Sequence, residues 1–569
     1  MNHADPDVII VGAGPVGLTS ALELSRFGIR SVVLERFPGV SWHPKCRNMS
    51  TRTMEIIRRW GEPVFGRIVN IDAGDDWKSP IRFLKSLVGE ELSSIETPGF
   101  LGPGGDISPA APVMSSQDLL EDVLIDTARK DPLIEVLMEH EVTQILQGFA
   151  VTDEGVEVEV LDRRAGLKRS IRAGALVAAD GAESLVRAQS GVQLEGPTDL
   201  AFLINVYFRG ELEPHLNGRR GVLMFVNNPE AQGVFQPLDG RGRWLSQVAV
   251  NKARWSGPEF DEQRCIDWIR AGAGVPDLEV EIVNIGRWVM NASIATSFVV
   301  GRTILVGDAS HQLPPTGGFG VNSGMQGTHN AMWKLALWLR GEAGYDLVRS
   351  YHDERHPVAC SIAAQTIENH KAVRYVGRST KAAAPPGVSA DEIRKATRRY
   401  GNHLGMELGA CYSSIAVVSD GTTGPVLEDS YTDYVPSATP GARIPHLWLG
   451  EGRSVSTHDL VNTRFVLIVD QPGATPWAAA VQTAAQRCHI EIDVAVIGST
   501  GLEDVDGRFL DLFGISDTGA VLIRPDAHVA WRSASLPAEP GQLLGEVLAG
   551  ILASDALPSA RKPWSTPLA

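Results

Sequence analysis

The residues most able to do chemistry lie at positions 301–322, where an apolar stretch ends at Asp308 and a glycine-rich loop follows. The stretch predicts a buried strand, and helical spacing resumes after the loop. Glycines let the backbone approach a flat polar ligand closely, while Pro314 and Pro315 stiffen the loop and remove two N–H donors. The segment predicts a ligand cradle with Asp308 as an acceptor, unless that carboxylate only caps the turn.

A second group lies near the start of the chain, in the turn Gly12-Ala13-Gly14-Pro15-Val16-Gly17. The turn separates an apolar run at 8–11 from helical spacing at 18–27. An anion at such a helix start gains about 0.3 to 1 kcal/mol, which favours a pyrophosphate there. A second predicted strand ends at Glu35, about 20 residues later, where dinucleotide-binding folds place the acid that accepts from a ribose hydroxyl. This predicts a complete βαβ unit without distinguishing FAD from NAD.

Other elements must position these two sites. Alternating stretches between 141 and 160 predict antiparallel strands, and a further buried strand ends at Asp180-Gly181. From 201 to 283 the alternating segments are longer and richer in aromatic residues, which predicts a separate sheet that forms one wall of a substrate pocket. From 464 to 552 the expected order of elements is β-α-β-β-β-α, which indicates a small α/β unit.

Composition excludes several classes of partner. The 569 residues, 43% hydrophobic and 21% charged, have room for two to four domains. A net charge of −16 disfavours nucleic acid and anionic membranes, so we expect a small-molecule partner. Five cysteines without a CxxC pair predict free thiols and no metal site. The chain start lacks a basic signal segment and no long apolar run occurs, so a cytoplasmic protein is expected.

Three separated motifs resemble one family, the group A flavoprotein monooxygenases, over essentially the whole chain. The glycine turn with Glu35 is similar to the family's FAD fingerprint, residues 180–187 to its Asp-Gly motif, and Gly307-Asp308 to the start of its ribityl-binding motif. The tail resembles the thioredoxin-like domain of the phenol hydroxylase and aromatic polyketide hydroxylase branch.

The resemblance implies an α/β fold in which a Rossmann-like FAD-binding domain carries an inserted mixed-sheet substrate domain and a C-terminal thioredoxin-like domain. We expect the FAD-binding domain at 1–185 and 284–400, the second part including connecting helices. The substrate domain is expected at 186–283 and the thioredoxin-like domain at 401–569. Since the tail has no CxxC, its expected role is packing or homodimer contact rather than disulfide exchange.

The resemblance also implies which residues bind FAD. It places Arg47 near the pyrophosphate and Gln117 on the ribose, with a solvated surface arginine and a first-turn helix residue as the alternatives. Asp180 could instead only begin a loop. The backbone N–H groups of Val321 and Asn322 are expected to face the pyrimidine end of the flavin. The full predicted set is Gly12, Gly14, Pro15, Val16, Gly17, Glu35, Arg36, Arg47, Gln117, Asp180, Gly181, Asp308, Pro315, Gly318, Gly320, Val321 and Asn322.

The implied reaction is hydroxylation of a phenolic or polycyclic aromatic, polyketide-like substrate. NADPH or NADH reduces the flavin, which then carries oxygen from O2 as a C4a-hydroperoxide. No second Rossmann unit is expected for the nicotinamide. The flavin carries the chemistry, so no catalytic side chain is predicted, and neither His43 nor His311 is assigned as a base. Candidate pocket residues, each of which could also be core, are Phe225, Phe235, Gln236, Pro237, Trp288 and Pro315.

Three alternatives remain open. The same scaffold could catalyse a Baeyer–Villiger or ring-opening oxygenation. A flavin halogenase is disfavoured because the chain lacks a Trp-x-Trp-x-Ile-Pro segment. A catalytically silent flavin-binding protein is suggested only by the tail and by Gly327-Thr328, which replaces an Asp-Ala pair that the family often has in its helix after the loop.

Overall fold

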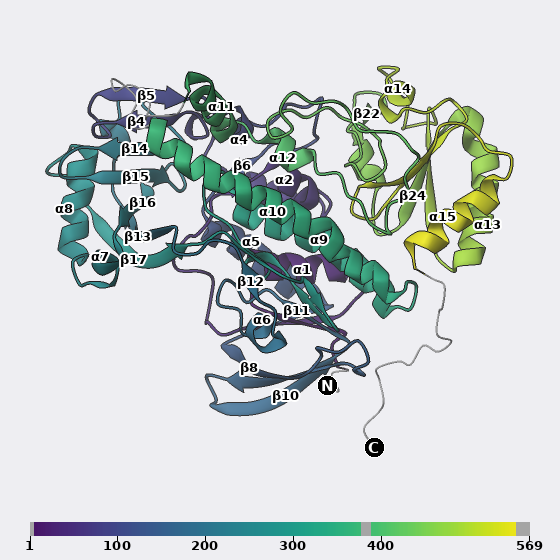
Figure 1. Cartoon of the computed structure of the whole chain (residues 1–569), viewed down its shortest axis with the longest axis horizontal. Coiled ribbons are helices and arrows are strands. Elements are labelled where there is room, and N and C mark those ends of the chain that lie inside the picture. Colours follow the sequence, from purple (N-terminus) through teal and green to yellow (C-terminus); the bar gives the residue numbers. More distant parts are fainter. Residues whose placement is uncertain (1–4, 377–388, 554–569) are drawn as a thin grey trace.

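The computed structural model describes residues 5–376 and 389–553 as a mixed α/β protein with several sheets (Figure 1). The predicted first βαβ unit is present, because β1 (Val8–Val11) and β2 (Ser31–Glu35) pair in parallel and α1 (Pro15–Arg26) joins them. The sheet has six strands in the order β19-β20-β11-β1-β2-β7. Its other strands are β7 (Ile134–Met138), β11 (Ala175–Ala178), β19 (Val299–Val300) and β20 (Thr303–Leu305).

Helices and short strands surround this sheet. The alternation between 141 and 160 forms a three-stranded antiparallel sheet at the bottom of Figure 1, made of β8 (His140–Gln147), β9 (Val156–Asp162) and β10 (Leu167–Ala173). The short elements are β3 (Asn48–Met49), α2 (Thr51–Arg58), α3 (Glu62–Val69), α4 (Pro98–Leu101), β6 (Val113–Met114), α5 (Gln117–Lys130), α6 (Leu185–Ser190), β12 (Leu194–Glu195), β18 (Ser293–Ala295) and β21 (His311–Gln312).

A seven-stranded sheet, the middle sheet, includes strands from outside the range 186–283 that we expected for the substrate domain. Its order is β17-β13-β16-β15-β14-β4-β5. Two strands come from within 1–185, and β17 extends beyond 283. Because β4 pairs with β14 in parallel across a long stretch of sequence, local pattern could not reveal the partnership. The strands are β4 (Ile81–Leu84), β5 (Glu91–Ile95), β13 (Ala201–Arg209), β14 (Leu223–Asn227), β15 (Gln232–Pro237), β16 (Arg243–Val250) and β17 (Glu281–Met290).

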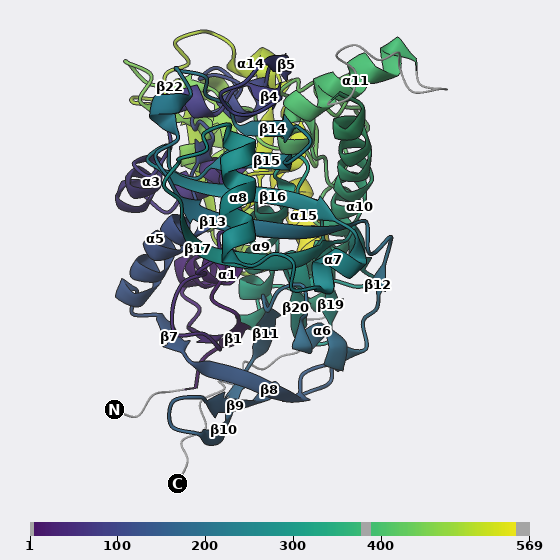
Figure 2. The same cartoon turned by 90° about the vertical axis from the view of Figure 1, so that its left-hand side faces the viewer.

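Two helices, α7 (Lys252–Ser256) and α8 (Glu262–Ala273), accompany the middle sheet on the left of Figure 1, and α8 stands in front of the sheet in Figure 2. The sheet and α8 share a hydrophobic core that is separate from the core of the six-stranded sheet. One face of the middle sheet is therefore covered by α8. The other face is left to meet the six-stranded sheet and the elements around it, which we call the first domain.

Long helices cross the molecule between the middle sheet and the C-terminal part (Figure 1). These are α9 (Phe319–Leu339) and α10 (Tyr345–Val376), followed by α11 (Ala390–Gly401) and α12 (Leu404–Leu408). The departure at Gly327-Thr328 does not interrupt α9. A Cβ at Gly327 would lie 3.4 Å from the Tyr351 hydroxyl, so the glycine is at a packed contact between α9 and α10.

The C-terminal part has the expected order β-α-β-β-β-α, with one added short helix. Its sheet order is β25-β24-β26-β27, in which β24 and β25 are parallel and the other pairs antiparallel. The bounds are β24 (Phe465–Asp470), α13 (Ala474–Cys488), β25 (Ile492–Ile497), α14 (Phe509–Phe513), β26 (Ala520–Ile523), β27 (Val529–Ser533) and α15 (Pro540–Ile551), preceded by a small ladder of β22 (Trp448–Leu449) and β23 (Val455–Ser456).

All five cysteines are free thiols. Across residues 5–376 and 389–553, no helix combines the length and the apolar character needed to cross a bilayer.

Candidate active site

The glycine turn after β1 has the geometry of an anion site at the start of α1. Gly14 is the N-cap, and no side chain caps the helix. A Cβ on Gly12 would clash with the carbonyl oxygen of Ala179, and a Cβ on Gly17 would clash with that of Gly12. A Cβ on Gly14, in contrast, would meet no atom within 4 Å. Gly12 and Gly17 thus serve close packing, while Gly14 leaves open space at the positive end of a helix, where a phosphate is favoured.

Glu35 holds this turn in place from the end of β2. Its carboxylate accepts from the N–H of Ala13 at 2.8 Å and from the N–H of Phe37 at 3.0 Å. Each oxygen retains a lone pair, so the group can still accept from a ribose hydroxyl. Arg36 is exposed, and its guanidinium lies 5.0 Å from the ring of Phe37.

Gln117 lies at the first position of α5 and connects two neighbouring segments. Its Oε1 accepts from the N–H of Lys45 at 3.1 Å, and its Nε2 donates to Glu121 Oε1 at 2.6 Å. Burial raises the pKa of Glu121, although the Gln117 bond opposes that shift. The side chain is buried and structurally engaged, so its contact with a ribose stays a prediction.

Asp180 follows β11 and caps α6. Its carboxylate accepts from Ser184 Oγ at 2.5 Å and from the N–H of Val186 at 3.1 Å. Burial raises the pKa of Asp180 against these hydrogen bonds. Gly181 has a φ of 83°, which favours glycine, and Arg187 of the same motif donates to the carbonyl of Ala309 at 3.0 Å. The motif thereby joins α6 to the cradle.

Asp308 lies on a short 3-10 turn, η3 (Gly307–Ala309), immediately after β20. Its carboxyl group is reached by solvent, yet protein atoms surround it, so burial raises its pKa while Lys45 opposes the shift. Among the described residues, no hydrogen bond to this carboxyl group is found. That absence disfavours the turn-capping alternative. A charged acceptor in such surroundings is unfavourable without a donor, which fits a group that receives ligand hydroxyls.

The start of α9 supplies a second uncapped helix N-terminus. Gly318 is its N-cap with a φ of 71°, and no side chain caps it. A Cβ on Gly320 would meet no atom within 4 Å. The side chain of Asn322 is buried and fixes the helix start, because its Oδ1 accepts from the N–H of Ser50 at 2.8 Å and its Nδ2 donates to the carbonyl of Asn48 at 2.9 Å. The first-turn N–H groups, including that of Val321, have no capping acceptor.

The two glycine-containing segments lie against each other. A Cβ on Gly307 would lie 3.1 Å from the side chain of Val16, and a Cβ on Gly324 would also meet Val16. The helix starts of α1 and α9 are thus brought to one region of the molecule, with Asp308 beside them. This arrangement fits an elongated dinucleotide whose phosphates lie at α1 and whose ring end lies at α9.

Arg47 donates to protein acceptors, and its contact with the pyrophosphate stays a prediction. Its Nε donates to Gln236 Oε1 at 3.0 Å, and its Nη groups donate to the carbonyls of Pro237 at 3.1 Å and Val222 at 2.5 Å. Burial lowers its pKa to about 10. Since these acceptors belong to the middle sheet or its margin, Arg47 fastens that sheet to the first domain in this structure.

The candidate pocket residues lie on both faces of the middle sheet. Along β15 the side chains alternate, so Gln236 faces Arg47 while Phe235 stacks on Trp268 of α8, with ring centroids 5.2 Å apart. Phe235 is fully buried and belongs to the core of the middle sheet, which favours the core alternative for this candidate. Phe225 is on the same face as Gln236, and its ring stacks on Phe83 at 5.1 Å.

Trp288 lies on the face of β17 that meets the first domain. Its Nε1 donates to Asn205 Oδ1 at 2.9 Å, and Gly286, two residues earlier on the strand, packs against His43 of the first domain. Pro315 is exposed in the cradle loop. Trp288 and Gln236 therefore remain candidates for the wall opposite the cradle.

Neither His43 nor His311 has the partners of a general base. His43 Nδ1 bonds Asn284 Oδ1 at 2.6 Å, and burial lowers its pKa. His311 lies 3.3 Å from Ser323 Oγ, and burial together with Arg355 lowers its pKa to about 4. Both rings fit structural roles.

We expect the thermal unfolding midpoint to fall as pH decreases from 6.5 to 4.5. The pKa of His311 is about 4 in the folded protein, against about 6.5 in an unfolded chain. The unfolded chain therefore takes up the proton first, and stability present above pH 6.5 is lost as pH falls toward the folded pKa. Replacing His311→Gln should reduce the slope of midpoint against pH in scanning fluorimetry. An unchanged slope would show that folding does not lower the pKa of His311.

Comparison with known proteins now decides the family. A family model described as FAD binding domain matches residues 5–366, and another described as aromatic-ring hydroxylase, C-terminal, matches residues 437–554. The chain is an FAD-dependent aromatic-ring hydroxylase. The hydroxylase is 33% identical to tetracenomycin B2 monooxygenase-dioxygenase of Streptomyces olivaceus, over 97% of this chain and 100% of that protein.

Solved structures agree with this family. The flavin-dependent monooxygenase PieE, in complex with FAD and substrate, matches the hydroxylase with a TM-score of 0.87 and 31% identity, over 97% of this chain and 100% of that chain. A ternary complex of aklavinone-11 hydroxylase with FAD and aklavinone matches with a TM-score of 0.81 and 30% identity, over the same shares of the two chains. The predicted family, FAD cofactor and NAD(P)H-dependent monooxygenase activity on aromatic rings are confirmed.

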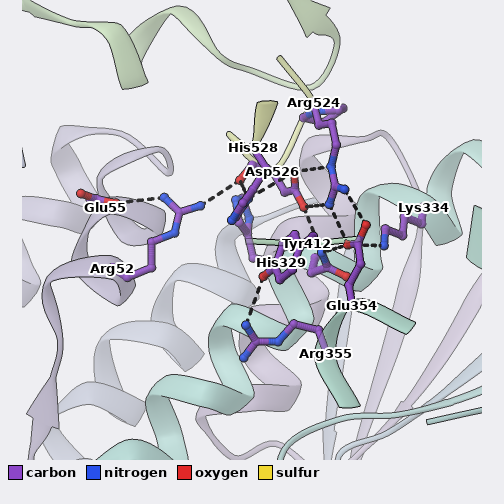
Figure 3. A network of polar contacts seen from close by, with 12 residues as sticks. Arg52, Glu55, His329, Lys334, Glu354, Arg355, Tyr412, Arg524, Asp526 and His528 are labelled. Atoms are coloured by element: carbon purple, nitrogen blue, oxygen red, sulfur yellow. Dashed lines mark hydrogen bonds and ion pairs between the residues drawn. The ribbon is translucent and has the colours of Figure 1, made fainter. Parts of the chain in front are cut away.

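Sequence reasoning missed a set of buried charges beside the second half of α9 (Figure 3). They include Lys334 and Glu354 on α9 and α10, and Arg524 and Asp526 between β26 and β27, all at most 2% exposed. A weak signal existed, because Lys334 stands inside the apolar run Met332-Trp333-Lys334-Leu335 and a lysine is almost never buried without a partner. Its partners are far away in sequence.

Proposed function

We propose that the hydroxylase inserts one oxygen atom of O2 into a phenolic ring of a polycyclic, polyketide-like substrate, with NADPH or NADH as reductant. The observation that carries this proposal is the match over nearly the whole chain to tetracenomycin B2 monooxygenase-dioxygenase and to the aklavinone-11 hydroxylase complex. A flat aromatic substrate also suits a sheet face that carries the Trp288 indole and the Gln236 amide.

We place the FAD along the two helix starts. Gly14 and the first turn of α1 would hold the pyrophosphate, Glu35 the adenosine ribose, and Asp308 the ribityl hydroxyls. The N–H groups at the start of α9 would face the pyrimidine end, where they stabilise the negative charge that gathers on reduction. When bound, the flavin supplies the activated oxygen. The protein binds and orients the substrate and excludes water around the reacting atoms.

We propose the substrate wall from Trp288, Gln236 and Phe225 on the middle sheet. The indole of Trp288, fixed by its bond to Asn205, offers a flat apolar surface for stacking. Gln236 is fixed by Arg47, so its amide nitrogen keeps a defined position from which it can donate to a substrate oxygen. This wall would orient the ring and leave bond formation to the cofactor.

We further propose the following domain roles. Residues 81–95 and 201–290 would form the substrate domain, and the C-terminal four-stranded sheet with α13 and α15 would be a thioredoxin-like domain. A cytoplasmic location and a homodimer are part of the proposal. Size-exclusion chromatography with light scattering checks the dimer.

The activity test is anaerobic reduction of the bound flavin by NADPH and by NADH, with phenols and polycyclic quinones as a panel. We expect a polycyclic phenol to accelerate bleaching. In air, the same compound should yield a product heavier by about 16 mass units, the mass of one oxygen atom. A ring-opened or lactone product, seen by NMR, would favour the Baeyer–Villiger alternative. If neither nicotinamide bleaches the flavin with any compound, the silent flavin-binding alternative replaces the proposal.

We expect Trp288→Ala to raise KM for the aromatic substrate by about tenfold, because a stacked aromatic pair contributes about 0.5 to 1.5 kcal/mol beyond its buried area. FAD affinity should stay unchanged. Phe235→Ala is the contrasting variant, since removing a core phenylalanine costs about 3 to 5 kcal/mol of stability and should lower the unfolding midpoint instead. Steady-state kinetics and thermal unfolding separate the two. An unchanged KM in Trp288→Ala would remove Trp288 from the wall.

A further inference from the structure

Helix α9 joins two distant parts of the molecule. It starts at Gly318 in the cradle and has 21 residues, which corresponds to a length of about 31 Å. Its first half carries the proposed flavin contacts. Its second half carries Asn330 and Lys334, both fully buried polar side chains. A displacement of either half would move the other, because a helix transmits a shift along its axis.

The second half of α9 contacts a cluster of buried charges, and two of these charged residues come from the C-terminal part of the chain (Figure 3). Arg524 donates to both oxygens of Glu354 on α10, at 2.6 and 2.9 Å. It also donates to both oxygens of Asp526, at 3.0 and 2.5 Å. Lys334 donates to Glu354 at 2.8 Å. Asn330 donates to Glu354 at 2.6 Å and to Asp526 at 3.1 Å. It therefore connects α9 directly to the hairpin formed by β26 and β27.

We call Asn330, Lys334, Glu354, Arg524 and Asp526 the hairpin cluster. Its two cations and two carboxylates balance, and the four charged side chains are at most 1% exposed. Burial alone would raise the pKa of Glu354, but Arg524 and Lys334 lower it to about 2. Removing one of the four charges would leave the cluster with a net buried charge, which is strongly unfavourable. The cluster therefore admits one arrangement of the hairpin against α9.

Further hydrogen bonds connect α9 to the neighbouring segments. Arg59 of the first domain donates to His329 Nε2 on α9 at 2.8 Å and to the carbonyl of Pro525 at 2.6 Å. Nearer the cradle, Arg355 donates to the Tyr412 hydroxyl at 3.1 Å and to the carbonyl of Ser323 at 3.2 Å. Ser323 is in the second turn of α9, so these contacts reach the half of the helix that faces the proposed flavin.

We propose that Arg524 and Asp526 are positioning residues of the flavin site. Through Asn330 and Glu354 they hold α9 at the depth where its first-turn N–H groups meet the pyrimidine end of the flavin. The C-terminal domain thereby sets how strongly the reduced, negatively charged flavin is held relative to the oxidised one. This inference rests on the flavin placement under the proposed function, and the experiment below separates the two.

The test uses Asn330→Leu and Asp526→Asn. Asn330→Leu removes the direct link between α9 and the hairpin without removing a charge. Asp526→Asn removes one charge while keeping the shape of the side chain. The matched control is Asp420→Asn, the same substitution at the ion pair of Arg532 on the other side of the hairpin. In the described residues, neither side chain of that pair forms a hydrogen bond or ion pair with α9.

The readouts are the midpoint potential of the bound flavin, by spectroelectrochemistry, and the affinity of the apoprotein for oxidised FAD, by fluorescence quenching. We expect both variants to hold reduced flavin about tenfold more weakly relative to oxidised flavin, which is about 30 mV toward negative potential for a two-electron couple. The control should match the unsubstituted protein. Should both variants lose thermal stability without a shift beyond that of the control, the cluster is structural only and the inference is overturned.

Gly320→Val distinguishes the proposed flavin placement from the proposed role of the hairpin cluster. A side chain at this position enters the open space at the start of α9. An unchanged potential and affinity in Gly320→Val would refute the proposed placement of the flavin. A shift in Gly320→Val without one in Asn330→Leu would refute only the positioning role of the hairpin cluster. If Asp526→Asn fails to fold, Asn330→Leu decides the question by itself.

Discussion

Replacing Gly14 with valine should strongly weaken FAD binding while the apoprotein keeps its fold. Gly14 has φ −71° and ψ 178°, which any residue adopts, and a Cβ there meets no atom within 4 Å. The protein itself thus has room for the side chain. The pyrophosphate, however, must come close to the backbone at the start of α1, and a valine occupies that approach.

We expect the affinity of Gly14→Val for FAD to fall by at least about 100-fold, equivalent to about 2.8 kcal/mol. Flavin content after purification and fluorescence titration of the apoprotein measure the loss. Gly424→Val is the matched control, because a Cβ at Gly424 is equally unobstructed and lies in an exposed loop. It should retain full flavin. Normal FAD content in Gly14→Val would show that the pyrophosphate lies elsewhere.

Gly17 gives the opposite case within the same turn. A Cβ there would clash with the carbonyl of Gly12, so Gly17→Ala should damage the packing of α1 on β1 before any ligand is considered. The two glycines look equivalent in the sequence pattern. Their different roles depend on what lies beside each Cα, which only the folded structure shows.

The parts of the fold that could be predicted depend on neighbours in sequence. The βαβ unit, the strand before Asp308 and the order of elements in the tail follow from local periodicity and turn residues. The hairpin of β4 and β5 could not be assigned to the middle sheet in the same way, because β14, which pairs with β4, is more than a hundred residues away. Local pattern shows that a strand is present and does not show which sheet receives it.

The candidate site shows the same limit at the level of single residues. Alternation along β15 places Phe235 and Gln236 on opposite faces, but the sequence does not say which face meets α8. Arg47 stands in a motif that predicts a phosphate contact, yet Gln236 and Pro237, its acceptors, come from the middle sheet. Partners brought together by tertiary packing decide what a polar side chain does.

Asp308→Asn should change the apoprotein and the FAD complex in opposite directions. In the apoprotein, burial raises the pKa of Asp308, so the ionised carboxylate is less favourable there than in the unfolded chain. Stability is then lost as pH rises from the unfolded value, near 3.9, through the folded pKa. At pH 7 the neutral amide avoids this loss, so the unfolding midpoint of the apoprotein should rise in the variant.

FAD binding by Asp308→Asn should weaken, because ribityl hydroxyls donate more strongly to a carboxylate than to an amide. A hydrogen bond to a charged group contributes about 1.5 to 3 kcal/mol, which corresponds to about a 10- to 100-fold loss of affinity. Scanning fluorimetry at pH 7, with and without FAD, measures both effects. Asp180→Asn is the control. Burial raises the pKa of that carboxyl group too, but it accepts from Ser184 and Val186, and an amide with a single acceptor oxygen would lose one of these bonds, so the apoprotein midpoint should fall. A lower apoprotein midpoint in Asp308→Asn, or an unchanged FAD affinity, would mean that Asp308 acts as Asp180 does, as a structural cap.

The two carboxylates resemble each other in sequence, since each follows a buried strand. They differ in having or lacking protein donors, and a carboxylate without protein donors at the meeting point of two helix starts is best explained by donors that arrive with the cofactor.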